Sequence, residues 1–105
     1  MARYDVYQNT GRQSSVAPFL VDVQSNHLGQ LASRVVIPLR RLDSFPDVRL
    51  PFDLTPVVVF EGIECFMDTP QLAAVPVREL GNALGSLNKQ QPEIVNALDR
   101  LFGAF

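Results

Sequence analysis

The chain has 105 residues, of which 47% are hydrophobic and 19% charged, and its formal net charge is −2. This composition is typical of a chain with a packed core and excludes a disordered one. Eight prolines and six glycines argue against a helical bundle, because each interrupts regular structure. The acidic balance argues against broad nucleic-acid binding, which usually needs a basic face. We therefore expect one domain over residues 1–105.

The scarcity of cysteine and histidine excludes further classes. Cys65 is the one cysteine and His27 the one histidine, so neither an internal disulfide nor a Cys/His zinc site fits within the chain. No apolar run approaches the roughly 20 residues that a membrane span needs. The start, Met1 to Asp5, lacks the apolar segment of a signal peptide. We expect a cytoplasmic protein that holds no metal and no cofactor.

Short β-rich runs separated by turn residues predict a series of strands. A proline within the third run, Pro38, predicts that this strand ends there or borders a sheet edge, since proline donates no ladder hydrogen bond. The proline-rich stretch 40–56 predicts a surface excursion with at most short strands. The expected strands cover residues 2–8, 17–23, 33–39, 55–61, 63–68 and 73–77.

The strongest hairpin signal lies in the middle of the chain. Two β-rich runs, 57–60 and 63–67, flank the dipeptide Glu61-Gly62. A two-residue connection that carries glycine is typical of a tight β-hairpin.

The last segment changes its hydrophobic period. From Ile94 onward the apolar residues recur at helical spacing, which predicts a helix over about 88–102. Asn88 and Gln91 match a capping box, and Gly103 suits the C-terminal end. The whole pattern predicts a mainly β protein with one C-terminal α-helix, built as a small, curved antiparallel sheet or barrel.

Candidate catalytic groups are few. Cys65 lies in an apolar strand pattern, which favours a buried structural thiol over a nucleophile. His27 lies in a polar loop, where a contact or solvent-facing role is favoured over a general base. Asp22 interrupts an apolar strand, so its carboxylate faces either solvent or a backbone donor.

Two surface features leave alternatives open. Arg34, Arg40, Arg41 and Arg49 form either a solvated face or a basic patch for RNA. The ending 101–105 carries two phenylalanines and no polar tail. It either packs on the sheet or forms a contact surface for a partner.

Several segments together resemble the CcdB family, the toxin half of a bacterial toxin–antitoxin pair that poisons DNA gyrase. Their order, their spacing and the total length agree over nearly the whole chain, with the 40–53 region as the weaker part. The segments that carry the resemblance are Phe19-Leu20-Val21-Asp22-Val23-Gln24-Ser25, Arg34-Val35-Val36-Ile37-Pro38-Leu39, Thr55-Pro56-Val57-Val58, Ala73-Ala74-Val75-Pro76-Val77, and Ile94-Val95-Asn96-Ala97-Leu98 with Phe102.

The resemblance implies an SH3-like small antiparallel β-barrel, the CcdB/MazF toxin fold, and a homodimer. It also implies a non-enzymatic mechanism, in which the toxin binds the gyrase A subunit and traps the enzyme on cleaved DNA. The implied second partner is a CcdA-like antitoxin that neutralises the toxin and supplies the contacts to operator DNA when the complex represses transcription. The gyrase-binding positions that it implies are His27, Leu28, Asp99, Phe102, Gly103, Ala104 and Phe105.

The chain departs from the best-known family pattern at its end. There the shared phenylalanine is followed by Trp-Gly-Ile, whereas this chain has Gly103, Ala104 and Phe105. Asp99 also replaces an amide. Two alternatives to the gyrase poison therefore stay open: an endoribonuclease toxin of the MazF/Kid type that uses Arg34 or Arg40 on the same fold, and a family member without toxicity.

Overall fold

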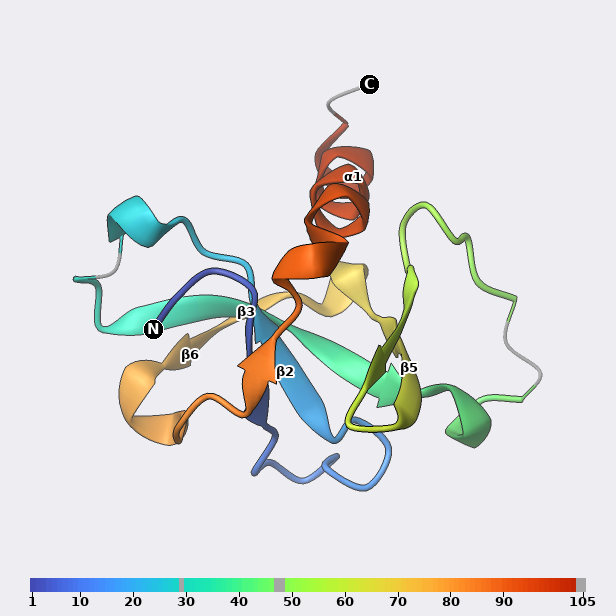
Figure 1. The fold of residues 1–105 in the computed structure, drawn as a ribbon, viewed down its shortest axis with the longest axis horizontal. Helices are drawn as coiled ribbons and strands as arrows, with labels where there is room; N and C mark the ends of the chain where they lie inside the picture. The colour runs from blue at the N-terminus through green and yellow to red at the C-terminus, as the bar shows by residue number, and fades with distance from the viewer. Residues whose placement is uncertain (29, 47–48, 104–105) are drawn as a thin grey trace.

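A computed structural model describes residues 1–28, 30–46 and 49–103 of the chain. Its main feature is one seven-stranded sheet in which every pairing is antiparallel. Figure 1 shows the sheet curled into a half-barrel, with the last helix of the described residues standing away from it. The expectation of a mainly β fold with one C-terminal helix is confirmed.

The strands follow one another along the sheet in the order β4-β5-β3-β2-β1-β7, and β6 pairs with β3 beside this path. Their bounds are β1 Asp5–Gln8, β2 Phe19–Asp22, β3 Ser33–Arg41, β4 Val57–Phe60, β5 Ile63–Met67, β6 Ala73–Pro76 and β7 Gly85–Ser86. Five 3-10 turns lie among the described residues: η1 Asn26–Leu28, η2 Leu42–Ser44, η3 Thr69–Gln71, η4 Val77–Glu79 and η5 Asn88–Gln90. The helix is α1, Gln91–Phe102.

The predicted hairpin is confirmed. β4 and β5 pair from Val57 opposite Phe66 to Phe60 opposite Ile63. The two turn residues, Glu61 and Gly62, have φ of 50° and 76°. Positive φ at both central residues is the requirement of a type I′ turn, whose twist matches that of the flanking strands.

Pro38 does not end its strand, and β3 is no edge strand, so this expectation is wrong. β3 continues to Arg41 and pairs with β2 over residues 36–39. On its other side it pairs with β6 over residues 33–36 and with β5 over residues 39–41. Pro38 falls between these two partners, where no strand needs its missing N–H, and its carbonyl accepts a bond of 3.0 Å from the amide of Asp68.

Other boundaries differ from the prediction for local reasons. Strand β1 begins at Asp5, because Tyr4 has φ of 76°, outside the extended range. The helix begins at Gln91 and not at residue 88, since residues 88–90 form the turn η5. The predicted capping box is wrong, because the N-cap residue is Gln90 and makes no side-chain bond there. The two-residue strand β7 escaped the sequence analysis.

The core lies inside the curl of the sheet and under the start of the helix. Alternate residues of the strands point into it, among them Val21 and Ile37, which have no exposed surface. The rings of Phe19 and Phe60 meet edge to face with centroids 5.0 Å apart, so strands β2 and β4 contact each other across the interior. Ile94 and Ala97 anchor α1 to this core. The far half of the helix is thereby left to project from the sheet (Figure 1).

Candidate functional site

The last turn of α1 presents an apolar side chain to solvent. Phe102 is 69% exposed, although Ile94 and Ala97 on the same helix are buried. Gly103 ends the helix as predicted: its φ is 73° and its N–H donates to the carbonyl of Asp99. The structure therefore brings Asp99, Phe102 and Gly103 together at the helix end. The predicted positions Ala104 and Phe105 lie outside the described residues.

The second group of predicted residues lies on the turn η1, which follows strand β2. Ser25 shapes this turn, because its carbonyl accepts from the amide of Leu28 at 3.0 Å and its hydroxyl accepts from the amide of His27 at 3.2 Å. These bonds satisfy the backbone amides of the turn. The side chains of His27 and Leu28 face outward. His27 is exposed and Leu28 is 49% exposed.

The two groups occupy separate places on the molecule. Figure 1 shows η1 and the C-terminal end of α1 apart from each other, both projecting beyond the sheet toward the top of the view. A partner that contacts both must therefore span the surface between them.

Sequence reasoning missed the residues between the η1 turn and the start of the helix. A hollow of about 320 Å³ lies there, lined by Arg3, Tyr4, Ser25, Asn26, His27 and Gln91. The amide of Arg3 donates to Oδ1 of Asn26 at 2.7 Å, and the Arg3 guanidinium lies 5.1 Å from the centroid of the Tyr4 ring. The left-handed backbone of Tyr4 is a conformation that non-glycine residues rarely adopt. Nothing in the local pattern signals it, since residues 2–8 read as one strand.

A buried ion pair lies beneath the η1 turn. Nε of Arg34 donates to Oδ2 of Asp22 at 2.7 Å, and Nη2 donates to Oδ1 at 3.0 Å. Neither side chain has exposed surface. The sequence pattern predicts that Asp22 faces solvent or a backbone donor. The carboxylate does accept from the amide of Gln24 at 3.0 Å, but its main partner is Arg34, 12 residues away.

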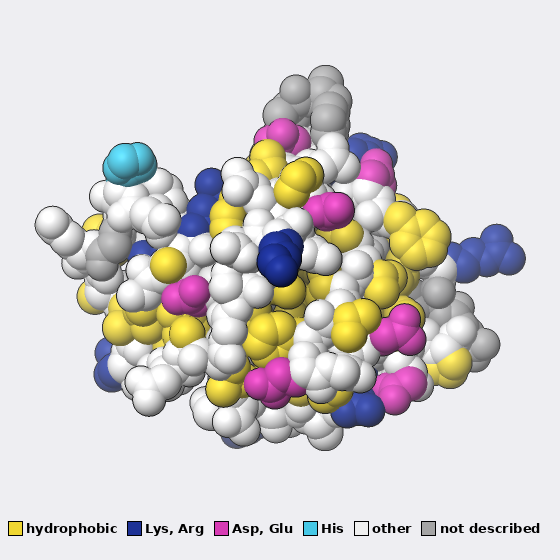
Figure 2. Space-filling model, viewed as in Figure 1, with side chains coloured by type: hydrophobic (Ala, Val, Ile, Leu, Met, Phe, Trp, Pro, Cys, Tyr) yellow, Lys and Arg dark blue, Asp and Glu magenta, His cyan; other side chains and the backbone are white. Residues whose placement is uncertain are grey.

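Three of the four arginines that the sequence left open as a basic patch are paired with carboxylates, and the fourth, Arg49, is exposed. Arg34 is buried against Asp22, and Nε of Arg40 donates to Oδ2 of Asp68 at 2.6 Å. Arg41 pairs with Asp43 at 3.0 Å and holds the pKa of that carboxyl below its usual range. On the face of the molecule that Figure 2 shows, basic and acidic side chains are interspersed, and hydrophobic ones gather below α1. The two arginines nominated for an RNA groove are thus both neutralised by carboxylates.

Cys65 is the buried structural thiol that its strand pattern predicts. It has no exposed surface, and burial raises the pKa of its thiol to about 11. The thiol is therefore protonated at neutral pH and is a poor nucleophile.

In residues 1–28, 30–46 and 49–103, no three or more histidine, cysteine or acidic side chains gather as metal ligands would. Over the same part of the chain, no helix combines the length and the apolar character needed to cross a membrane.

Residues 3–103 match the model of a protein family described as CcdB protein. The chain belongs to the CcdB family. The match runs from the residue before Tyr4 to the glycine that ends α1, so it includes the η1 turn and the described part of the helix end. CcdB family membership supports a CcdB-type toxin, and the curled antiparallel sheet with one C-terminal helix is consistent with the small β-barrel fold of CcdB. The resemblance drawn from the sequence segments is thereby confirmed.

Proposed function

We propose that this protein is the toxin of a type II toxin–antitoxin pair, which binds the A subunit of DNA gyrase and traps the enzyme on cleaved DNA. The observation that carries the proposal is the apolar end of α1, in a chain whose residues 3–103 match the CcdB family. Phe102 is 69% exposed there, on a helix whose other end is anchored in the core. A large exposed aromatic side chain on a rigid element is a typical anchor for a protein partner.

The proposed mechanism is contact between proteins without catalysis. Burying an exposed phenylalanine on a partner contributes roughly 1.5–3 kcal/mol. The η1 turn, with exposed His27 and half-exposed Leu28, supplies a second contact. Two contacts on separate projections favour a partner that encloses the toxin, which is consistent with insertion between gyrase subunits.

The proposal includes the other partners of the family. We propose a homodimer and a CcdA-like antitoxin that neutralises it, with operator DNA bound only through the antitoxin. An exposed apolar side chain besides Phe102 is available for such interfaces, since Val59 on strand β4 is 58% exposed.

A gyrase cleavage assay tests the proposal. Purified protein is mixed with gyrase, supercoiled DNA and ATP, and linear DNA is measured after the enzyme is denatured. We expect linear DNA to accumulate with the wild type. The variant Phe102→Ala and a chain that ends at residue 102 should both lose most of this effect.

The matched control is Phe52→Ala, because it makes the same substitution at a phenylalanine of similar exposure on another part of the surface. We expect it to poison gyrase as well as the wild type does. If folded wild-type protein yields no linear DNA, or if Phe102→Ala retains full effect, the assignment is wrong. RNA cleavage that Arg40→Ala abolishes would favour the endoribonuclease instead. Antitoxin binding without growth arrest would favour a family member without toxicity.

A further inference from the structure

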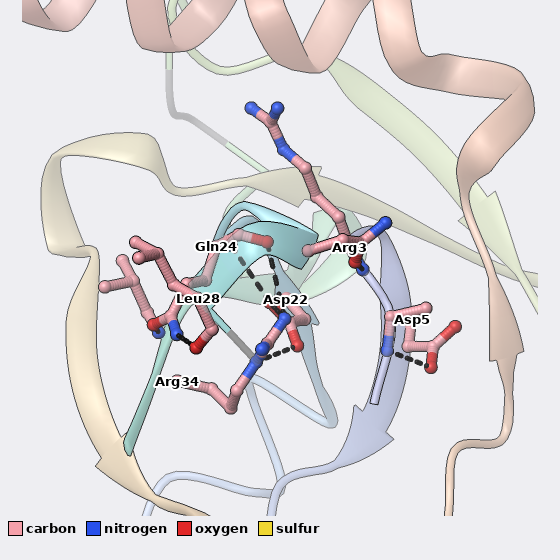
Figure 3. Close-up of polar contacts among 9 residues, drawn as sticks. Arg3, Asp5, Asp22, Gln24, Leu28 and Arg34 are labelled. Carbon is pink, nitrogen blue, oxygen red and sulfur yellow. Dashed lines mark hydrogen bonds and ion pairs between the residues drawn. The ribbon is translucent and has the colours of Figure 1, made fainter. Parts of the chain in front are cut away.

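A polar network connects the buried ion pair to the η1 turn through one side chain, that of Gln24. Figure 3 shows the Asp22 carboxylate and the Arg34 guanidinium directly beside Gln24, and Leu28 on the other side of it. Gln24 is itself buried, with 7% of its surface exposed.

The ion pair forms hydrogen bonds with both the backbone amide and the backbone carbonyl of Gln24. The amide of Gln24 donates to Oδ1 of Asp22 at 3.0 Å, and its carbonyl accepts from Nη2 of Arg34 at 3.3 Å. The planar guanidinium thus bonds two carboxylate oxygens and one carbonyl oxygen at once, for which a lysine ammonium lacks the geometry. The residue that leads from strand β2 into the turn is held on the strand side by charged groups.

The side chain of Gln24 then reaches the turn. Its Oε1 accepts from the amide of Val35 at 3.0 Å, and its Nε2 donates to the carbonyl of Leu28 at 2.9 Å. An amide supplies one acceptor and one donor group from a single side chain, so glutamine satisfies strand β3 and the turn together. A carboxylate of the same length has no proton for the Leu28 carbonyl, and an aliphatic side chain satisfies neither group.

We propose that Gln24, oriented by the Asp22–Arg34 pair, is a positioning residue that fixes the η1 turn for partner binding. The proposal rests on the proposed function, because it assigns to the η1 turn a shape that the gyrase A subunit recognises. Gln24 is buried beneath the turn, so it acts through His27 and Leu28 and not by touching the partner.

A buried ion pair is in general a costly way to stabilise a fold, since well-packed apolar side chains often do as well. Here the pair also directs the amide and carbonyl of Gln24. It therefore gives the turn a defined position relative to the sheet. A loop held in its bound shape before association loses less conformational entropy when it binds.

The test compares Gln24→Leu with the core control Val58→Ala. Gln24→Leu removes both side-chain bonds at similar volume. Val58 is buried on strand β4, outside the network, so its truncation lowers stability without touching the turn. Amide hydrogen exchange of Leu28, whose N–H closes the turn onto Ser25, reports the order of the turn without any partner. Calorimetric titration with the gyrase A fragment measures the affinity of each variant for this partner.

We expect Leu28 in Gln24→Leu to exchange roughly threefold to tenfold faster than in the wild type, as the loss of a net hydrogen bond implies. The affinity for the gyrase A fragment should fall by a similar factor. Val58→Ala should lower the thermal midpoint and change neither readout. Unchanged exchange and affinity in Gln24→Leu would overturn the positioning role, and so would equal losses in Val58→Ala.

Two further arms keep the outcome decisive. If Gln24→Leu fails to fold, Arg34→Lys replaces it, because it keeps the charge and removes the fork that holds Gln24. The same faster exchange and weaker binding are then expected. If the wild type does not bind the gyrase A fragment, the proposed function fails, and with it the link to gyrase. In that case the exchange of Leu28 alone decides whether Gln24 positions the turn.

Discussion

The ring of Phe60 lies against the backbone of Gly85, so closely that a β-carbon on Gly85 would be 3.0 Å from Cζ of the ring. Phe60 belongs to β4 and Gly85 to β7, which stand at opposite ends of the strand order. The contact therefore shows how far the sheet curls, since its two ends meet over the core. This close approach, and not the backbone angles, is what favours glycine at position 85.

Gly85→Ala should destabilise the protein by about 1–3 kcal/mol, because the added methyl group forces the Phe60 ring away from its contact with Phe19. Urea denaturation measures the change in the free energy of unfolding. Gly81→Ala is the matched control, since a β-carbon at Gly81 meets no atom within 4 Å. That control should leave stability nearly unchanged, and an equal loss in both variants would contradict the packing argument.

Removing one partner of the Asp22–Arg34 pair should lower the free energy of unfolding more than removing both partners. We expect Arg34→Met to lower the free energy of unfolding by about 3–5 kcal/mol, because it leaves the Asp22 carboxylate buried without its partner. The double variant Asp22→Leu with Arg34→Met should recover much of that loss, and urea denaturation of both variants checks it. A double variant no more stable than Arg34→Met would mean that the pair contributes through packing alone.

The hairpin turn offers changes in both directions. Glu61→Asn should stabilise the protein by up to about 1 kcal/mol, since asparagine adopts the left-handed conformation of position 61 more readily than glutamate. Gly62→Ala should destabilise it by about 1–2 kcal/mol, although a β-carbon there meets no atom, because the cost lies in the backbone. The thermal midpoint should rise in Glu61→Asn and fall in Gly62→Ala. If both midpoints move in the same direction, the assignment of the turn type is wrong.

Alkaline pH should destabilise the protein through Cys65. Burial raises the pKa of its thiol from 9.0 to about 11, so the folded chain holds this proton more tightly than the unfolded one. The resulting contribution is fully present below pH 9 and is lost as the pH rises toward about 11, an effect of about 2–3 kcal/mol.

Cys65→Ala isolates this contribution. Its stability difference from the wild type should be constant below pH 8 and shrink between pH 9 and about 11 in urea denaturation. The pKa of Tyr7 is also raised, chiefly by burial, but both proteins share that residue, so its titration cancels. A pH-independent difference would show that the thiol titrates alike in both states.

Local patterns predicted the elements whose causes are local. The hairpin at Glu61-Gly62 and the helix end at Gly103 follow from turn and cap chemistry that a few neighbouring residues contain. Of the apolar residues that recur at helical spacing, Ile94 is buried and Leu98 packs against the core. The ordered segments also sufficed to recognise the CcdB family, which the match over residues 3–103 confirms.

Tertiary structure alone decided the features that depend on distant neighbours. Pro38 is tolerated inside β3 because β6 and β5 happen to leave a gap beside it. Strand β7 exists because Gly85 and Ser86 pair with β1. The strand propensity of two residues is too little to predict such a pairing. The sequence pattern alone is typical of a surface charge at Arg34. The pairing of β2 with β3 places this side chain against Asp22. A sequence pattern reports what each residue prefers, but which charges meet and which edges close depends on how the strands come together.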